Sequence, residues 1–469
     1  MKKALALLLV LAMVFALAAC GNAKTDLAKP EQQQERQQER QQESTGTQDV
    51  SAPQEVVFWH SLSGAAGDEI QAIVDEYNAG QGAEKGILVN AVYQGYQGTD
   101  KVILAYQTND TENACDINIG LTSTIPSMLD LDWTVKASDL MEKYDSSISV
   151  EDFHPAMARS VTYMDEMVAI PFLNSTMLLY YNVDALKEAG IENPPATMDQ
   201  MIQDIVALTK KDANGNITQY GLECQVKRYH LVQFLVSQNE RAFFCDMEGG
   251  RVGAPTKLTC DEDGTLAAFL DKWDEVIATG GYQYLENNVS EDFSTGLAAM
   301  VMMSSSKCGS VFELVGDSFE WRTAPIPSVN ESDTSGAAVG GSCLVMFNRG
   351  DDKRVEAAWD FVQYLCTADV QTRITAVTGY IPTVKSAEGT TALNEFYSAN
   401  PQYATAFEVI KTSSAMAQEP MDLCYNEING TITDIMVQYC EGSLTKDQAY
   451  SELISQCNKL LDEWHEANS

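Results

Sequence analysis

Basic side chains are scarce in this sequence. Lysine and arginine together number 30, against 67 aspartates and glutamates, and the formal net charge at pH 7 is −37. A nucleic-acid-binding protein needs lysine and arginine to neutralise phosphates. Electrostatic attachment to an anionic membrane surface needs them as well. The composition therefore argues against both of these partners.

Metal-binding and catalytic signatures are also missing. The four histidines are scattered, and no Cys-x-x-Cys or His-Glu-x-x-His pattern occurs, so zinc and thioredoxin-like redox sites are unsupported. The motifs Gly-x-Ser-x-Gly, Gly-x-x-x-x-Gly-Lys and Gly-x-Gly-x-x-Gly are absent too, which removes the usual signs of a hydrolase, a P-loop enzyme or a dinucleotide enzyme. We predict a protein that is not an enzyme and holds no metal or cofactor. A glycosidase stays open as an alternative, because its paired carboxylates can lie far apart in the sequence.

One segment matches part of a calcium-binding loop. Oxygen-bearing side chains stand at the first, third, fifth and twelfth positions of an EF-hand pattern, and they belong to Asp212, Asn214, Asn216 and Glu223. Ile217, however, stands where the sharp turn of such a loop requires glycine. The Asn-Gly pair within the segment is a common hairpin turn. We expect a hairpin here and keep calcium as the alternative.

The cysteines do not form the pattern of a small disulfide scaffold. The chain has 11 cysteines, and all except Cys20 lie in the main body of the sequence. Ten cysteines in a body of this size are too few for a fold that depends on disulfides. Reduced cysteines in the core are one expectation. A bridge between Cys245 and Cys260, which flank one polar loop, is the other.

The N-terminus has the features of an export signal. Lys2 and Lys3 precede an apolar run that ends at Ala19, and the run is too short for a comfortable membrane-spanning helix. Its last residues, Leu-Ala-Ala-Cys-Gly, resemble a bacterial lipobox. The resemblance implies a signal peptide over residues 1–19, a lipid such as palmitate on Cys20, and a position on the extracytoplasmic face of the cell membrane. An ordinary signal peptide with an accidental cysteine is the alternative.

A low-complexity tract follows the predicted lipid site. Residues 22–54 contain almost no large apolar side chain, and residues 31–43 consist only of glutamate, glutamine and arginine. Such a segment has nothing to bury and should stay solvated. We predict a disordered linker over residues 20–54 that tethers the folded body to its anchor. No later apolar stretch has the length of a membrane span.

Short apolar strands alternate with amphipathic helices through the rest of the chain. The patterns predict strands at residues 56–59, 87–93, 116–121, 167–172, 177–182, 220–224, 298–303, 322–327 and 340–347. They predict helices at residues 67–78, 100–107, 183–190 and 198–210, from residue 356 onward, and over 431–464. This alternation favours an α/β fold with a parallel-type sheet, in which ligands bind beyond the carboxyl ends of the strands.

The loops that follow these strands are polar but carry little charge. They contain mainly hydroxyls, amides, glycines and aromatic rings, which suit a neutral polyhydroxylated solute better than acid–base catalysis. Trp59 and Tyr229 are candidate stacking surfaces, and His60 is a candidate hydrogen-bonding residue. Core packing explains Trp59 equally well, and a supporting position behind the site explains His60. The serines, threonines and asparagines could instead cap helices.

Three motifs, taken in order, resemble bacterial extracellular solute-binding proteins of family 1, the receptors of ABC-type carbohydrate importers. They are Phe58-Trp59-His60-Ser61, then Pro171-Phe172-Leu173-Asn174-Ser175-Thr176 followed by Leu179-Tyr180-Tyr181-Asn182, and finally Thr378-Gly379-Tyr380-Ile381-Pro382. The likeness runs from about Val56 to Trp464 and is greatest to the glycerol-3-phosphate-binding branch of the family. Each motif alone is weak, but their order and spacing are specific.

The resemblance implies a two-lobe, periplasmic-binding-protein-like α/β fold of type II, with a hinge and a ligand cleft between the lobes. Residues 55–170 and 325–378 would form lobe 1, and residues 171–324 and 379–469 would form lobe 2. A monomer of this kind closes on a small-molecule solute and delivers it to the membrane subunits of an ABC permease. A surface adhesin or scaffold that keeps the fold without transport is a rival interpretation.

The resemblance also implies particular ligand-binding positions. Tyr96 matches the aromatic residue of the family's Tyr-x-Gly loop, and Ser175 matches the serine after its Pro-Phe motif. Ser304 matches the serine that follows a strand ending in methionine. Gly341 matches the second glycine of a Gly-Gly pair, and Tyr380 matches the aromatic residue of Thr-Gly-Tyr.

Two positions depart from the pattern of the glycerol-3-phosphate branch. Its glutamate appears here as Thr122, and its arginine on a late helix appears as Asn429. Because arginine is the natural partner of a phosphate dianion, its loss favours a neutral mono- or oligosaccharide. The alternative ligand is glycerol-3-phosphate or a glycerophosphodiester, bound through Arg228 or Lys307 as a substitute cation. For Arg228 itself we expect a solvated position at the start of a helix.

Overall fold

The computed structural model describes residues 52–334 and 336–468, except for the side chain of Tyr96. The predicted signal peptide, Cys20 and all but the end of the predicted linker lie outside the described residues. Pro53–Ser469 forms one compact unit. Among its described helices, none combines the length and the apolar character needed to cross a bilayer.

The first of two mixed sheets has the strand order β2-β1-β3-β14-β4, with β7 also paired to β14. Its strands are β1 (Gln54–His60), β2 (Ile87–Tyr93), β3 (Ile117–Leu121), β4 (Thr134–Val135), β7 (Ile170–Ser175) and β14 (Gly340–Phe347). β1 runs parallel to β2 and β3, whereas β14 runs antiparallel to β3, β4 and β7. A short hairpin, β5 (Thr162–Tyr163) and β6 (Glu166–Met167), stands apart from it.

The second sheet has the order β11-β10-β12-β8-β13, with β9 paired to β10. Its strands are β8 (Met177–Asn182), β9 (Lys210–Lys211), β10 (Ile217–Cys224), β11 (Tyr282–Tyr284), β12 (Ala298–Ser304) and β13 (Trp321–Pro325). β10 is parallel to β11 and β12, and β8 is antiparallel to β12 and β13. The carboxyl ends of β10, β11 and β12 therefore meet at one edge of this sheet.

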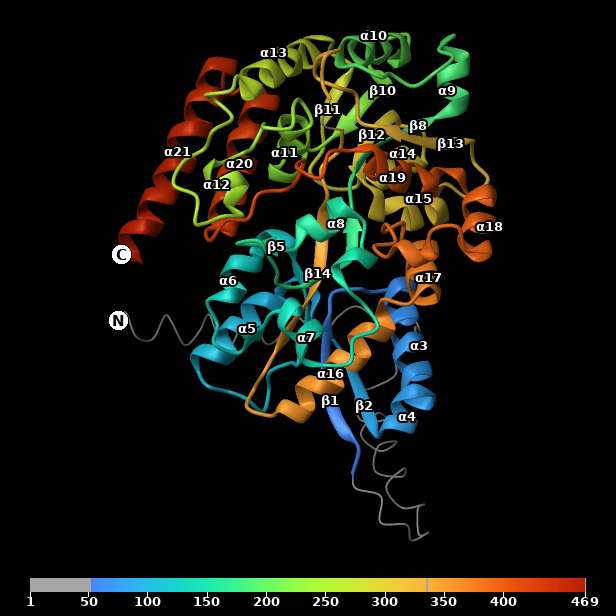
Figure 1. Cartoon of the computed structure of the whole chain (residues 1–469). Helices are drawn as coiled ribbons and strands as arrows, with labels where there is room; N and C mark the ends of the chain where they lie inside the picture. The colour runs from blue at the N-terminus through green and yellow to red at the C-terminus, as the bar shows by residue number, and fades with distance from the viewer. Residues whose placement is uncertain (1–51, 335, 469) are drawn as a thin grey trace, which may run out of the picture. The chain divides into compact units, whose positions relative to one another are not determined.

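Helices cover the first sheet because their apolar faces recur at helical spacing. They are α3 (Ala65–Ala79), α4 (Gln81–Lys85), α5 (Gly98–Gln107), α6 (Ile125–Leu129), α7 (Ala137–Lys143), α16 (Asp352–Leu365) and α17 (Ala368–Thr378). In α3 the predicted apolar positions Ile70, Ile73, Val74 and Tyr77 are all buried. Figure 1 shows α3, α4 and α16 beside β1 and β2. The burial of these faces stabilises the first lobe.

A separate set of helices surrounds the second sheet. It consists of α9 (Val183–Glu188), α10 (Met198–Leu208), α11 (Arg228–Val236), α12 (Asp246–Gly250), α13 (Thr265–Ala278), α14 (Val289–Ser294), α15 (Cys308–Val315), α19 (Pro401–Thr412), α20 (Tyr425–Cys440) and α21 (Lys446–Ala467). Residues of α10, α11, α13, α20 and α21 share one apolar core, and residues of α14, α15 and α19 share another. Two further α-helices of the described residues are α8 (Pro155–Ser160) and α18 (Thr391–Ala399).

Most predicted elements are confirmed, and β2, β8 and β14 have the predicted bounds. The predicted strand at residues 167–172 is divided, because Met167 ends the β5–β6 hairpin and β7 begins only at Ile170. The predicted helix over 431–464 is two helices, separated near Gly442, which has a φ of 78°. The expectation of a parallel-type sheet holds only in part, because β7, β8, β13 and β14 are antiparallel to their neighbours.

The chain passes between the two sheets more than once. β7 belongs to the first sheet and β8 to the second, so the first passage lies at Thr176. The return lies between β13 and β14, that is, between Pro325 and Gly340. After Gly379, Leu393 still packs into the core of the first sheet, and α19 then packs on β13. The passages do not test the predicted lobe limits at 170/171, 324/325 and 378/379, which stay predictions.

The expectations about the cysteines and about the hairpin at Asp212 have clear outcomes. The predicted Cys245–Cys260 bridge is wrong, because both residues are free and buried. The alternative is confirmed: the described cysteines are free thiols, and all of them except Cys440 are buried. The expected hairpin at Asp212 is also confirmed, because β9 and β10 pair antiparallel. The Asp212 carboxylate accepts the N–H groups of Asn214 at 2.8 Å and Asn216 at 2.9 Å.

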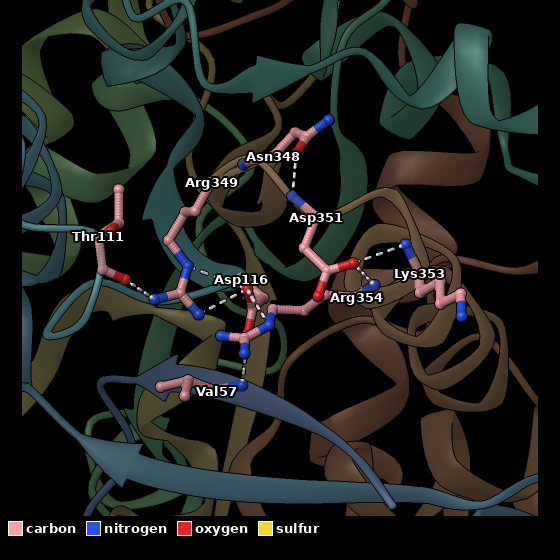
Figure 2. Close-up of polar contacts among 9 residues, drawn as sticks. Val57, Thr111, Asp116, Asn348, Arg349, Asp351, Lys353 and Arg354 are labelled. Atoms are coloured by element: carbon pink, nitrogen blue, oxygen red, sulfur yellow. Dashed lines mark hydrogen bonds and ion pairs between the residues drawn. The ribbon is translucent and has the colours of Figure 1, made fainter.

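A buried ion pair at the edge of β3 joins distant parts of the first lobe (Figure 2). Asp116 is 1% exposed and accepts the Val57 N–H at 2.7 Å. It also accepts two N–H groups of Arg349, at 2.7 and 3.0 Å. Asp351 has a different task, because its carboxylate caps the first turn of α16. The Asp116 contacts therefore connect β1, the start of β3 and the loop before α16.

We expect Asp116→Ala to lower the free energy of unfolding by about 3–5 kcal/mol, because it leaves the buried Arg349 charge without its carboxylate partner. The matched change Asp351→Ala removes a helix cap and should cost about 1 kcal/mol. Urea unfolding of both variants measures the difference. Equal losses would show that the Asp116–Arg349 pair is not a central stabilising contact.

Candidate functional site

The start of β14 makes an unusually close backbone contact with β7. Gly341 has a φ of +100°, and a Cβ placed on it would lie 2.3 Å from the carbonyl oxygen of Leu173. The β14–β7 register shifts between Gly341 and Cys343. Leu173 itself has a φ of 55°, which is rare for a bulky residue. Such bulges and strained residues re-aim side chains and cluster beside binding sites.

Several of the predicted residues meet at this contact. Ser175 is the ladder partner of Gly340. Thr122 is 1% exposed, and its hydroxyl approaches the Gly341 carbonyl oxygen at 3.4 Å. Tyr229 also adjoins the pair, because its Cε2 atom is 2.8 Å from where a Gly340 Cβ would stand. Thr122 at the end of β3, Ser175 at the end of β7 and Tyr229 on α11 thus surround the Gly-Gly pair.

Tyr229 links this group to Ser304. Burial raises the pKa of Tyr229, and Glu419 adds to the effect, whereas the Ser175 and Ser304 side chains oppose it. Tyr380 is close enough to raise the pKa slightly as well. The Tyr229 hydroxyl nevertheless has no hydrogen-bond partner of normal geometry among the described residues. It therefore remains able to bond to a ligand.

Two pockets adjoin the group and share Lys307 and Ser310. The first has a volume of about 420 Å³ and lies beyond the carboxyl ends of β10, β11 and β12. Its lining includes Gln225, Tyr229, His230, Glu286, Asn288, Glu291, Met302 and Ser304. The second has a volume of about 340 Å³ and is lined from both lobes, by Ser61, Leu62, Gly64, Ser306, Glu313, Val377, Thr378 and Tyr380.

The remaining predicted residues are not drawn into this group. Trp59 is buried in the core of the first lobe. His60 is buried beside the Tyr93 ring, with centroids 5.9 Å apart, and burial lowers its pKa. Asn429 is half-buried on α20. Tyr96 belongs to a 3-10 turn at Gly95–Gln97, and its side chain lies outside the described residues.

Arg228 is neither solvated nor available as a free cation, which corrects both expectations for this residue. It is 1% exposed, and its Nη2 atom lies 2.7 Å from the Asp422 carboxylate. The same atom donates to the Pro420 carbonyl oxygen at 3.1 Å. The guanidinium also stacks over the Tyr425 ring, 4.6 Å from its centroid. Asp422 and the ring thus hold Arg228 in the interior.

Glu419 is the functional candidate that sequence reasoning missed. Its Oε2 atom lies 4.0 Å from Arg228, and its Oε1 atom lies 2.9 Å from where a Gly340 Cβ would stand. Burial raises the pKa of Glu419 to about 7, although Arg228 and Arg251 oppose this. Among 67 acidic residues, no local pattern distinguishes this one. Only its tertiary contacts place it beside the Gly-Gly pair.

Buried polar atoms without partners gather around these residues. They are the Ser123 and Tyr229 hydroxyls, the Arg228 Nε atom and the Asp422 Oδ1 atom. Buried polar groups are normally hydrogen-bonded, so such atoms are suited to a bound ligand or water. In the described part of the chain, no group of histidine, cysteine, aspartate and glutamate side chains could hold a metal ion. The unpartnered polar atoms make the arrangement fit to bind a polar solute.

Comparisons with known proteins point to one family. The family model described as "Bacterial extracellular solute-binding protein" matches residues 72–405. The sn-glycerol-3-phosphate-binding periplasmic protein UgpB of Shigella dysenteriae serotype 1 is 24% identical over 428 residues, which cover 88% of this chain and 94% of that protein. UgpB of Rhizobium meliloti is 22% identical over 357 residues, covering 75% and 80%.

Solved structures agree with the predicted fold. The cyclic alpha-maltosyl-1,6-maltose binding protein of Arthrobacter globiformis superposes with a TM-score of 0.71 at 19% identity, covering 88% of this chain and 100% of that one. The sugar-binding protein MalE of Xanthomonas citri gives 0.72 at 20%, covering 88% and 98%. UgpB of Mycobacterium tuberculosis, bound to glycerophosphocholine, gives 0.70 at 16%, covering 89% and 100%. The two-lobe type II fold is thereby confirmed.

The two glycines allow a matched test of the contact at the centre of the site. Gly341→Ala places a Cβ 2.3 Å from a backbone oxygen at a φ of +100°, so we expect a loss of about 1–3 kcal/mol in unfolding free energy. Gly340→Ala meets side-chain atoms of Tyr229 and Glu419, which can move, and should cost less. Thermal unfolding compares the variants, and a greater loss for Gly340→Ala would contradict the geometry.

Proposed function

This chain belongs to the bacterial extracellular solute-binding proteins, and from that premise we propose that its cleft binds a neutral mono- or oligosaccharide. The bound sugar is delivered to the membrane subunits of an ABC permease. Ligand-driven closure of the two lobes gives the permease a loaded form to recognise. In this proposal the protein acts as a monomeric receptor and performs no chemistry on its ligand.

The pairing of Arg228 with Asp422 is the observation that carries the choice of a neutral ligand. A phosphate dianion needs a cation that is free to bond to it, and the guanidinium at this site is already held by a carboxylate at 2.7 Å. The hydroxyls of Ser123, Ser175 and Tyr229 lie nearby instead. Hydroxyl groups of this kind bond well to a polyol.

Glycerol-3-phosphate or a glycerophosphodiester is the second candidate. Two observations favour it. The UgpB relatives carry that specificity in their names, and Lys307 lines both pockets. Lys307 is exposed and makes no ion pair within the described part of the chain, so its ammonium group would be available to a phosphate. Binding of this ligand would have to rely on an exposed lysine in place of a buried arginine.

A ligand screen by thermal shift tests the proposal. We expect a neutral saccharide to raise the unfolding temperature and sn-glycerol 3-phosphate and glycerophosphocholine to leave it unchanged. A ligand present at 100 times its dissociation constant stabilises the folded state by about 2.7 kcal/mol. A shift with the phosphorylated glycerols alone would replace the first candidate by the second.

Tyr229→Phe is the variant that links the screen to the site. Its hydroxyl has no partner of normal geometry among the described residues, so its removal should leave stability unchanged while sugar affinity falls about tenfold, or roughly 1.4 kcal/mol. The control is Tyr439→Phe, whose hydroxyl donates to the Leu270 carbonyl oxygen at 3.3 Å. That change should cost about 1 kcal/mol of stability and leave sugar affinity intact. The opposite pattern would place the ligand elsewhere.

We also propose that Cys20 carries the lipid anchor and that residues 1–19 are removed. The support is the lipobox-like sequence before Cys20 together with the family's extracellular character. We expect Cys20→Ala to abolish labelling by a palmitate analogue and to release the protein from the membrane fraction, because stable anchoring requires acyl chains. Retention of the label on the variant would show that the anchor lies elsewhere.

A further inference from the structure

We infer that Glu419 is the specificity-determining residue of the cleft: its carboxylate accepts hydrogen bonds from ligand hydroxyl groups and repels a phosphate. This inference rests on the proposed receptor function and deepens it by naming the group that selects the ligand class. No motif or comparison points to Glu419. Its contacts alone single it out.

The Glu419 carboxylate lies beside the Gly-Gly pair, next to Tyr229. Glu419 Oε1 and Tyr229 Cε2 converge on Gly340, at 2.9 and 2.8 Å from where a Cβ would stand. The Glu419 side chain is 10% exposed. Within the described residues its carboxylate accepts no hydrogen bond; the Arg228 guanidinium approaches it to 4.0 Å, and Arg251 is the second cation near it. A carboxylate with open acceptor sites therefore stands beside a phenol whose hydroxyl lies near the Ser175 and Ser304 side chains but makes no hydrogen bond of normal geometry among the described residues.

The segment that carries Glu419 is held in place by buried contacts. The Arg251 guanidinium, itself buried, donates to the Glu419 carbonyl oxygen at 2.8 Å. The N–H of Met421 donates to the Gly249 carbonyl oxygen at 2.9 Å. Residues 247–250 form a left-handed turn with positive φ throughout, and a Cβ on Gly250 would lie 1.8 Å from the Met421 carbonyl oxygen. A strained, tightly packed turn thus preorganises the segment.

Charged groups surround Glu419, and they are unequally paired. Arg228 approaches Asp422 at 2.7 Å but Glu419 only at 4.0 Å, so Asp422 takes most of its attraction. The Asp422 Oδ1 atom and the Ser123 hydroxyl, both on residues 1% exposed, have no partner among the described residues. Arg251 is a second cation near Glu419, but its guanidinium donates to the Glu419 carbonyl oxygen and not to the carboxylate, so the carboxylate keeps open acceptor sites. Ligand hydroxyl groups can fill those sites, whereas a phosphate would meet the Glu419 and Asp422 carboxylates as like charges at low local dielectric.

The protonation of Glu419 gives this selection a pH dependence. Burial raises the pKa of Glu419 to about 7; Arg228 and Arg251 oppose this, and Asp422 adds to it. Tyr229 faces the same carboxylate and stays neutral, because burial raises its pKa further above the neutral range. As pH falls through about 7, Glu419 gains a proton and loses acceptor capacity. Affinity for a neutral sugar should therefore decline from pH 8 to pH 6.

Glu419→Gln is the decisive variant, because it removes the charge and half of the acceptor capacity at nearly constant shape. The probes are maltose and mannobiose as neutral ligands, with sn-glycerol 3-phosphate and glycerophosphocholine as phosphates, measured by calorimetry at pH 8 and pH 6. We expect sugar affinity to fall more than tenfold, its pH dependence to disappear, and phosphate binding to strengthen. Glu84→Gln, an exposed change on α4, removes the same charge and should change none of these.

Glu419→Asp keeps the charge and guards against a folding defect in the amide variant. It should weaken sugar binding but still prefer sugars to phosphates. The inference would be overturned if Glu419→Gln bound sugars as tightly as the wild type does, or if the wild type preferred the phosphate probes. Either result would leave the receptor function standing. A wild-type protein that responds to none of the probes would count against the proposed function, and the inference would fall with it.

Discussion

The close backbone contact between β14 and β7 is the constraint on which the cleft depends. A side chain at Gly341 would overlap the Leu173 carbonyl oxygen, so the two strands approach this closely only because glycine is present. The same contact lies where the chain leaves the first sheet for the second. It sets Ser175 opposite Gly340 and leaves room above the glycines for Tyr229 and Glu419. The passage between the two sheets and the proposed ligand site therefore share one structural feature.

Charge compensation around Arg228 underlies the ligand class that we propose for this site. A buried arginine is tolerable only when it is paired, and here Asp422, Pro420 and the Tyr425 ring supply the partners. The pairing neutralises the cation that a phosphate would seek. It also leaves carboxylate and hydroxyl acceptors unsatisfied on the side of the Gly-Gly pair. The neutral sugar that we propose as the ligand would supply hydrogen-bond donors to these acceptors, so the pairing of Arg228 bears on both folding and the proposed ligand class.

Sequence periodicity predicted the elements well where a single strand or helix buries its own apolar face. β2, β8, β14 and α3 are examples. It predicted sheet direction less well, because β7, β8, β13 and β14 arise where the chain crosses between sheets and not from strand–helix–strand units. The motif-based positions Ser175, Ser304, Gly341 and Tyr380 lie near one another with Tyr229 and Thr122. Trp59 and His60 instead pack inside the first lobe. Trp59 lies in its apolar core, and His60 contacts the Tyr93 ring.

By itself the sequence determined the shortage of basic residues, the order of strands and helices, the polar loops after the strands and the family. These features are local, or they follow from composition, and so they can be read without coordinates. Only the tertiary structure decided the burial and pairing of Arg228 and the position of Glu419 beside the Gly-Gly pair. The partners of Arg228 lie 192 and 194 residues away along the chain. Whether a charge is solvated, paired or left facing a ligand depends on such distant contacts, because burial and pairing together set its energy.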